Sequence, residues 1–253
     1  LEQIGIDRGI EYAQKLGIKN LVLTGPKNDR QLTLALGGIT KGVTPLELAS
    51  AYSTIANQGI YIEPEAILRI EDKNGRVLIE NKPEQWVAVN KQVAFMMTDM
   101  LRTVVTQGTG TRLANLPFPA AGKTGTTSDN KDVWFAGFSP RFTTVVWMGH
   151  DEPTPMSNVA GGKQPAIIWK DIMTVAHKDL PSTSFKKPDG IVGPIEICID
   201  SGKLPTELCK NDPRGSRVRR EYFIKGTEPT EFCTVHVEKP IDISTGLLAS
   251  PYC

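Results

Sequence analysis

The fold is decided by the stretch Ala121-Gly122-Lys123-Thr124-Gly125-Thr126-Thr127 and by the apolar run that follows it, Asp132-Val133-Trp134-Phe135-Ala136-Gly137-Phe138. An apolar run this continuous indicates a central strand that is covered on both faces. Three strands are therefore expected, over residues 120–127, 132–139 and 143–149. The turn Ser139-Pro140-Arg141-Phe142 predicts that the last two strands form an antiparallel hairpin.

Helices are expected around this sheet, which gives an α/β (α+β) layered unit. Thr44-Pro45-Leu46-Glu47 is typical of a capped helix start, and Asn90 can cap another helix. In that second helix, Val93, Met96, Met97, Met100, Leu101 and Val104 form one apolar stripe that we expect to pack into the core. Two further helices are expected over residues 7–17 and about 166–178. Asn74-Gly75 predicts a hairpin with a type I′ turn.

The strand that carries the Lys-Thr-Gly triplet is the candidate site. We expect the ammonium of Lys123 and the hydroxyls of Thr124 and Thr126 to project to one side and to bind a carboxylate. Gly125 has no side chain to hold a ligand away. Free backbone N–H groups on the strand edge could bind a substrate by strand addition or form half of an oxyanion hole. The triplet alone is a weak signal of function, so the interpretation depends on the residues that flank it.

Those flanks resemble a known family. Residues 123–127, 132–140, 143–149 and 165–170 follow one another as they do in the C-terminal half of the transpeptidase domain of bifunctional (class A) penicillin-binding proteins. The resemblance is close over residues 1–180 and looser to residue 239. It implies a partial penicillin-binding/β-lactamase-like transpeptidase fold over 1–180. A Pro/Gly-rich linker and a loop-rich, cysteine-containing appendage are expected over 181–253.

The resemblance also implies a function, that of a serine-type peptidoglycan D,D-transpeptidase. Lys123 would orient the substrate carboxylate and tune the proton network of the nucleophile, while Thr124 and Thr126 would bond that carboxylate. Gly125 would allow close approach, and the backbone N–H of Thr126 would be an oxyanion donor. The implied partners are stem peptides, β-lactam antibiotics and the upstream part of the same protein, including a glycosyltransferase domain. No cofactor or metal is implied.

The nucleophile of that family is missing from its expected place. The family combines Ser-x-x-Lys, Ser-x-Asn and Lys-Thr-Gly. Ser128-Asp129-Asn130-Lys131 spells the first two, but it follows Thr124 too closely to face its own strand. Ser184-Phe185-Lys186-Lys187 lies between two prolines, away from any helix start. We therefore expect no nucleophile in this chain, which alone should be inactive and incompletely stable.

The chain begins at Leu1 without a methionine, which suggests a piece of a longer protein that is anchored upstream at the extracytoplasmic face of a bacterial membrane. A net charge of +1 over 253 residues gives no reason to expect nucleic acid as a partner. A β-lactamase or D,D-carboxypeptidase fragment and a non-catalytic cell-wall-binding module are the alternatives. The Asp-x-Trp-Phe run and the residues after 180 favour the synthase.

Four cysteines, Cys198, Cys209, Cys233 and Cys253, lie in the last quarter of the chain. Their clustering predicts disulfides formed in an oxidising compartment. Zinc is the less favoured alternative, because no Cys-x-x-Cys spacing is present. The histidines at 150, 177 and 236 are too scattered to predict a metal site or a triad. The glycine-rich residues 107–111 and 161–163 predict loops, and arginines 214–220 predict a solvated loop.

Overall fold

The computed structural model describes residues 1–249, which form two compact units. The first unit runs from Leu1 to Lys187, and the second begins at Pro188. The first contains the α-helices α1 (Ile6–Lys15), α2 (Pro45–Ala56), α3 (Lys91–Gln107) and α4 (Gln164–Ala176) and the short 3-10 helices η1 (Leu32–Leu36), η2 (Thr111–Leu113) and η3 (Ser128–Asn130). None of the helices in residues 1–249 has the length and apolarity needed to cross a membrane.

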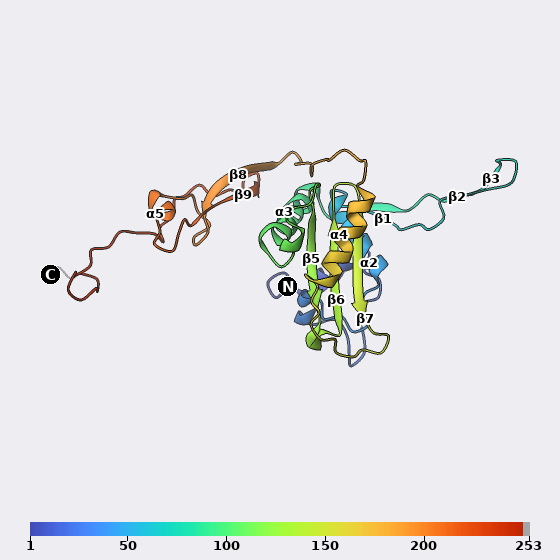
Figure 1. Ribbon diagram of the computed structural model, residues 1–253, viewed down its shortest axis with the longest axis horizontal. Coiled ribbons are helices and arrows are strands. Elements are labelled where there is room, and N and C mark those ends of the chain that lie inside the picture. Colours follow the sequence, from blue (N-terminus) through green and yellow to red (C-terminus); the bar gives the residue numbers. More distant parts are fainter. Residues whose placement is uncertain (250–253) are drawn as a thin grey trace. The chain divides into compact units, whose positions relative to one another are not determined.

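The main sheet consists of β5 (Ala121–Thr126), β6 (Asp132–Phe138) and β7 (Thr143–Gly149), all antiparallel and in that order. The three predicted strands and the hairpin between the last two are confirmed. In Figure 1, α4 crosses one face of this sheet, and α2 lies on the other face. Val133, Phe135 and Phe138 of β6 are fully buried, so the central strand is covered on both faces as predicted.

On one face, the core forms around α4. Trp169 is completely buried and meets Phe135 edge to face at 5.3 Å. Its indole N–H lies 3.2 Å from the carbonyl oxygen of Gly137 and 3.0 Å from that of Thr144. Because a buried indole N–H needs an acceptor, these contacts fix α4 against the backbone of β6 and β7.

On the other face, Phe138 and Ala121 are buried with Leu101 of α3. Tyr52 of α2 packs edge to face on Phe138 at 6.4 Å, and Phe185 does so at 5.7 Å. α3 therefore packs against the beginning of β5, at Ala121.

Both predicted helix caps are confirmed. Thr44 and Glu47 form a capping box at the start of α2, and Asn90 Oδ1 accepts a hydrogen bond from Val93 N at 2.8 Å at the start of α3. The predicted buried stripe of α3 is only partly correct. Its buried residues are Ala94, Phe95, Thr98, Leu101 and Val105, whereas Met97 and Met100 are exposed.

Two small sheets complete the first unit, one made of β1 (Ile60–Ile62) and β4 (Gln85–Val87), the other of β2 (Arg69–Glu71) and β3 (Val77–Glu80). The β2–β3 hairpin is the one predicted at Asn74-Gly75, but the type I′ turn is wrong. Of the two turn residues Asn74 and Gly75, only Gly75 has a positive φ, of 79°, whereas a type I′ turn needs a positive φ at both. Asp72 Oδ1 instead accepts hydrogen bonds from the backbone N–H groups of Asn74 and Arg76 and stabilises a longer loop.

The second unit contains an antiparallel hairpin of β8 (Ile191–Cys198) and β9 (Val218–Ile224) and the short helix α5 (Glu207–Lys210). The prediction of disulfides is wrong for the three described cysteines. Cys198, Cys209 and Cys233 are buried free thiols. The Sγ atoms of Cys198 and Cys233 are 3.6 Å apart, far beyond the length of about 2.05 Å for an S–S bond. Cys253 lies outside the described residues.

The hydrogen bonds of Trp169 give a first prediction. Trp169→Phe removes the buried N–H donor and leaves a small cavity, so we expect a loss of about 2–3 kcal/mol in the free energy of unfolding. Trp147→Phe is the matched control. Trp147 also donates through its indole, to Asp132 Oδ1 at 2.9 Å, but it is 38% exposed, so the expected loss is at most about 1 kcal/mol. Urea denaturation of the two variants measures the difference, and equal losses would contradict the assigned role of Trp169.

Candidate functional site

The Lys-Thr-Gly strand borders a cavity of about 730 Å³ in the first unit. Residues 123–128 of β5 and the turn after it form one wall. The opposite walls come from residues 33–39 around η1 and from Leu48 and Tyr52 of α2. β5 is an edge strand of the three-stranded sheet, and Trp134 and Ala136 of the central strand also line the cavity, which therefore extends over the face of the sheet.

The expectation that Lys123, Thr124 and Thr126 project to the same side is wrong. Side chains of directly paired residues lie on the same face of a sheet, and those of successive residues alternate. Thr124 and Thr126 pair with Phe135 and Val133, on the face covered by α4. Lys123 pairs with Ala136, on the opposite face. All three residues nevertheless line the same cavity.

Both threonine hydroxyls are held by residues outside the sheet. Thr124 Oγ1 lies 2.7 Å from Thr109 Oγ1, just after α3. The hydroxyl oxygen of Thr126 accepts a hydrogen bond from the backbone N–H of Gly161 at 3.3 Å. The two glycine-rich loops, for which the sequence suggested no clear role, therefore meet at the Lys-Thr-Gly strand and fix its side chains.

The close approach of these loops requires glycine. A Cβ atom on Gly161 would lie 2.6 Å from the carbonyl oxygen of Gly125 and would also clash with that of Trp134. A Cβ atom on Gly162 would clash with the carbonyl oxygen of Thr109. Because all these atoms belong to the backbone, they cannot move away as a flexible side chain could. The sequence signal that could have found this contact is the Gly161-Gly162 pair itself.

Lys123 supplies the positive charge of the site. Its side chain is exposed, and Nζ donates to the carbonyl oxygen of Thr124 at 3.0 Å. Within residues 1–249, no carboxylate forms an ion pair with this ammonium. Burial raises the pKa of Tyr52, on the opposite wall, to about 12, so its phenol stays neutral at physiological pH. The cavity can therefore attract an anion to Lys123.

Neither Ser-x-x-Lys tetrapeptide has the geometry of a nucleophile with a lysine one helical turn later. Ser128 lies in η3, where Asp129 and Asn130 have positive φ angles of 62° and 53°. Lys131 Nζ is 3.8 Å from Asp129 Oδ2. Ser128 does border the candidate cavity, but in a tight turn.

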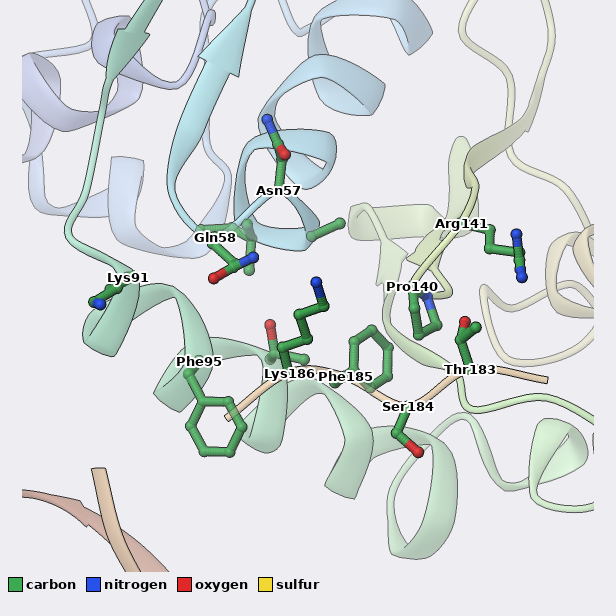
Figure 2. A pocket seen from close by; sticks show the side chains of 13 residues that line it. Asn57, Gln58, Lys91, Phe95, Pro140, Arg141, Thr183, Ser184, Phe185 and Lys186 are labelled. Carbon is green, nitrogen blue, oxygen red and sulfur yellow. The ribbon is translucent and has the colours of Figure 1, made fainter. Parts of the chain in front are cut away.

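Ser184 lies in an extended segment beside a different cavity, of about 310 Å³. Figure 2 shows the side chain of Lys186 pointing into that cavity and the hydroxyl of Ser184 pointing away from it. Phe185 between them packs on Phe138, which explains why the segment follows the surface of the first unit.

The histidines occupy three different environments. His150 is exposed. His177 follows α4, stacks on Phe118 at 3.8 Å and lies 2.9 Å from Ser139 Oγ through Nε2, so it is a packing residue. His236 lies in the second unit beside the three described cysteines, a grouping that the spacing of the histidines did not predict.

Comparison with known proteins identifies both units. Residues 1–174 match the family model "Penicillin binding protein transpeptidase domain", and residues 187–238 match "Penicillin-binding protein 1A, C-terminal domain". The chain is 38% identical over its whole length to penicillin-binding protein 1A of Clostridium botulinum and covers 30% of that protein. It is also 38% identical to penicillin-binding protein 1A of Aquifex aeolicus over 92% of this chain and 30% of the relative. The chain thus spans about 30% of the length of these curated relatives.

Solved structures give the same result. Penicillin-binding protein 1A from Haemophilus influenzae superposes with a TM-score of 0.74 at 29% identity, over 90% of this chain and 38% of that one. PonA1 from Mycobacterium tuberculosis in complex with penicillin V superposes with a TM-score of 0.62 at 29% identity, over 71% of this chain and 52% of that one. The fold predicted from the sequence is confirmed.

The contact of Gly161 with β5 gives a second prediction. Gly161→Ala forces the loop away from Gly125 and Trp134, so we expect it to destabilise the first unit by about 1–3 kcal/mol. Gly149→Ala is the matched control. Its Cβ atom would meet side-chain atoms of Trp147 and Asp132, which can move, and the expected loss is about 1 kcal/mol or less. Urea denaturation measures both losses. A Gly161 variant as stable as the unmodified chain would refute the required close approach.

Proposed function

Because this chain belongs to the penicillin-binding protein transpeptidase family, we propose that it is the C-terminal part of the transpeptidase domain of a class A cell-wall synthase. The reaction is the D,D-transpeptidation that cross-links peptidoglycan stem peptides. The parent protein acts at the extracytoplasmic face of a bacterial membrane and carries its anchor, glycosyltransferase domain and serine nucleophile upstream of Leu1. The observation that supports this proposal most is the cavity that Lys123–Thr126 line.

Each residue of that edge has a role in the proposal. Lys123 attracts the terminal carboxylate of a D-alanyl-D-alanine stem peptide and tunes the proton network of the serine. Thr124 and Thr126 donate hydroxyl hydrogen bonds to that carboxylate, which requires that Thr124 exchange its contact with Thr109 for the substrate. The backbone N–H of Thr126 is one oxyanion donor, and Gly125 lets the substrate approach the strand.

The reaction proceeds in two steps. The serine oxygen forms a bond to the carbonyl carbon of the penultimate D-alanine, and the terminal D-alanine leaves with a proton on its new amino group. The amine of a second stem peptide then attacks the carbonyl carbon of the acyl-enzyme and forms the cross-link, while the bond to the serine oxygen breaks and that oxygen takes a proton from the amine. β-Lactams replace the donor peptide in the first step, and their ring opens instead of releasing a leaving group.

The second unit favours a synthase over the other members of the same fold class. A β-lactamase or a D,D-carboxypeptidase shares the Lys-Thr-Gly strand, but the match of residues 187–238 is to the C-terminal domain of penicillin-binding protein 1A. A non-catalytic cell-wall-binding module would have no need of an exposed lysine beside two anchored hydroxyls.

Lys123→Ala in the full-length parent provides the third prediction. Losing a charge-assisted contact of about 1.5–3 kcal/mol slows acylation by a β-lactam roughly ten- to hundred-fold. The measurement is the acylation rate constant with a fluorescent penicillin. Lys131→Ala is the control, because Lys131 is a half-exposed lysine just before β6 that pairs with Asp129 and does not line the cavity. Its rate should stay unchanged. Unchanged acylation in Lys123→Ala would remove Lys123 from the mechanism.

The missing nucleophile gives the fourth prediction. After incubation with a β-lactam, intact-mass spectrometry of the isolated 253-residue chain should show no covalent adduct, whereas the full-length parent should carry one. Binding by the Lys-Thr-Gly strand alone should be weak and reversible. A stoichiometric adduct on Ser128 of the isolated chain would overturn this assignment and make the tight turn at η3 the nucleophile site.

A further inference from the structure

Three thiols and one imidazole converge at a single point in the second unit. The ligand atoms of Cys198, Cys209, Cys233 and His236 all lie within 4.8 Å of one another. They come from the end of β8, from α5 and from the segment after β9. We propose that these four residues bind one structural zinc ion. This inference depends on the second unit alone and not on the proposed function of the first.

The distances fit a tetrahedral Cys₃His site. With Zn–S bonds of about 2.3 Å and a Zn–N bond of about 2.0–2.1 Å, tetrahedral geometry separates two sulfurs by about 3.8 Å and a sulfur from the nitrogen by about 3.6 Å. The Sγ atoms of Cys198 and Cys233 are 3.6 Å apart. Nδ1 of His236 lies 3.5 Å from the former and 3.3 Å from the latter. A disulfide would join only two of the thiols and would leave the third buried beside them.

The imidazole of His236 is held in the orientation that a metal ligand needs. Its Nδ1 faces the sulfurs, and its Nε2 lies 3.1 Å from Asp200 Oδ2 and 3.1 Å from Asp212 Oδ2. A carboxylate that accepts the N–H of one ring nitrogen leaves the lone pair of the other free for the metal. Nε2–H therefore donates to the aspartates, and Nδ1 is the zinc ligand.

Two arginines hold those aspartates in turn. Arg217 donates to both carboxylate oxygens of Asp200, at 2.7 and 3.1 Å. Arg214 donates to Asp212 at 2.8 Å and to Asp200 at 2.9 Å. The basic segment that the sequence suggested to be a solvated loop thus supplies the outer support of the cluster. Arg219 and Arg220 pair elsewhere, with Glu221 and Glu196.

Backbone N–H groups point at two of the sulfurs. Thr206 N lies 3.3 Å from Cys209 Sγ, and Val235 N lies 3.4 Å from Cys233 Sγ. Hydrogen bonds of this kind favour the thiolate, which is the form that binds zinc. Three thiolates and a neutral imidazole around a divalent cation leave a single negative charge, and the nearby arginines offset it.

The second unit lacks an extended apolar core. Among its described residues, the buried apolar side chains are Pro188, Ile191 and the three cysteines, with Val218 packed against the cysteines. A unit this small without an apolar core usually needs a disulfide or a metal to fold. Because the protein provides all four ligands, no position remains for water or substrate, as expected of a structural site.

Metal analysis of the 253-residue chain, purified without chelators, tests the proposal. We expect one zinc per chain. Reconstitution with Co²⁺ should produce the thiolate-to-cobalt charge-transfer band and the d–d bands of tetrahedral coordination. This spectrum is the deciding measurement, because a ligand variant could lose metal simply by unfolding. Two results would overturn the proposal. One is a purified chain that holds no zinc and has a disulfide between two of the three cysteines, and the other is an octahedral spectrum after reconstitution with Co²⁺.

Variants refine the test. His236→Cys should keep the metal and shift the cobalt spectrum toward four thiolates, while His236→Ala should weaken zinc binding. Asp200→Asn should lower the zinc affinity about 10–100-fold through the orientation of His236. His150→Ala and Asp151→Asn change exposed residues of the first unit and are the matched controls. Cys253→Ser should keep the full zinc content, since four ligands are already present. Equal zinc affinity in all these variants would contradict the assigned ligands.

Discussion

The burial of most of β6 is the constraint on which the first unit depends. α4 covers one face of this strand at Phe135, and α2 packs on the other face at Phe138. On that second face Trp134 and Ala136 line the cavity, and Lys123 pairs with Ala136, so a ligand reaches the sheet there. α3 packs on the beginning of β5 at Ala121, and the part of β5 that lines the cavity starts at Lys123, where the Lys-Thr-Gly triplet lies. The position of the site follows from how the helices cover the sheet, and the triplet supplies the functional groups.

Local signals predicted the elements well, because their causes lie within a few residues. The capping box at Thr44 and the apolar run of β6 act over short distances, and both predictions are confirmed. The errors arise where the environment decides. Met97 and Met100 are apolar and in phase with the predicted stripe, yet the helix packs through Ala94 and Phe95, because neighbouring elements set which face is buried. In the same way, the Gly161-Gly162 pair can signal a close approach, but nothing local to it shows that the partner is Gly125.

The cysteines show a different limit of the sequence. Clustered cysteines fit both a disulfide framework and a metal site, and only their arrangement in space separates the two. The sequence has no Cys-x-x-Cys spacing, but it has Cys233-Thr234-Val235-His236, in which a histidine stands where that motif has its second cysteine. The remaining ligands come from Cys198 and Cys209, which chain spacing alone does not bring together. The pairing of β8 with β9 brings them together, because it places Cys198 opposite Val218 and so closes the loop that contains α5.

The two sites share one physical arrangement, in which the groups that face a ligand are oriented by contacts made elsewhere. Thr109 and Gly161 hold the hydroxyls of Thr124 and Thr126, and two aspartates hold the ring of His236. Orientation before binding lowers the entropy lost when a ligand arrives. The supports differ because the solvent exposure differs. The exposed strand edge relies on backbone contacts that glycine permits, whereas the more buried cluster needs charges to be balanced. Ion pairs such as Arg217–Asp200 contribute little stability as isolated surface pairs, and their value here is to fix the direction of His236.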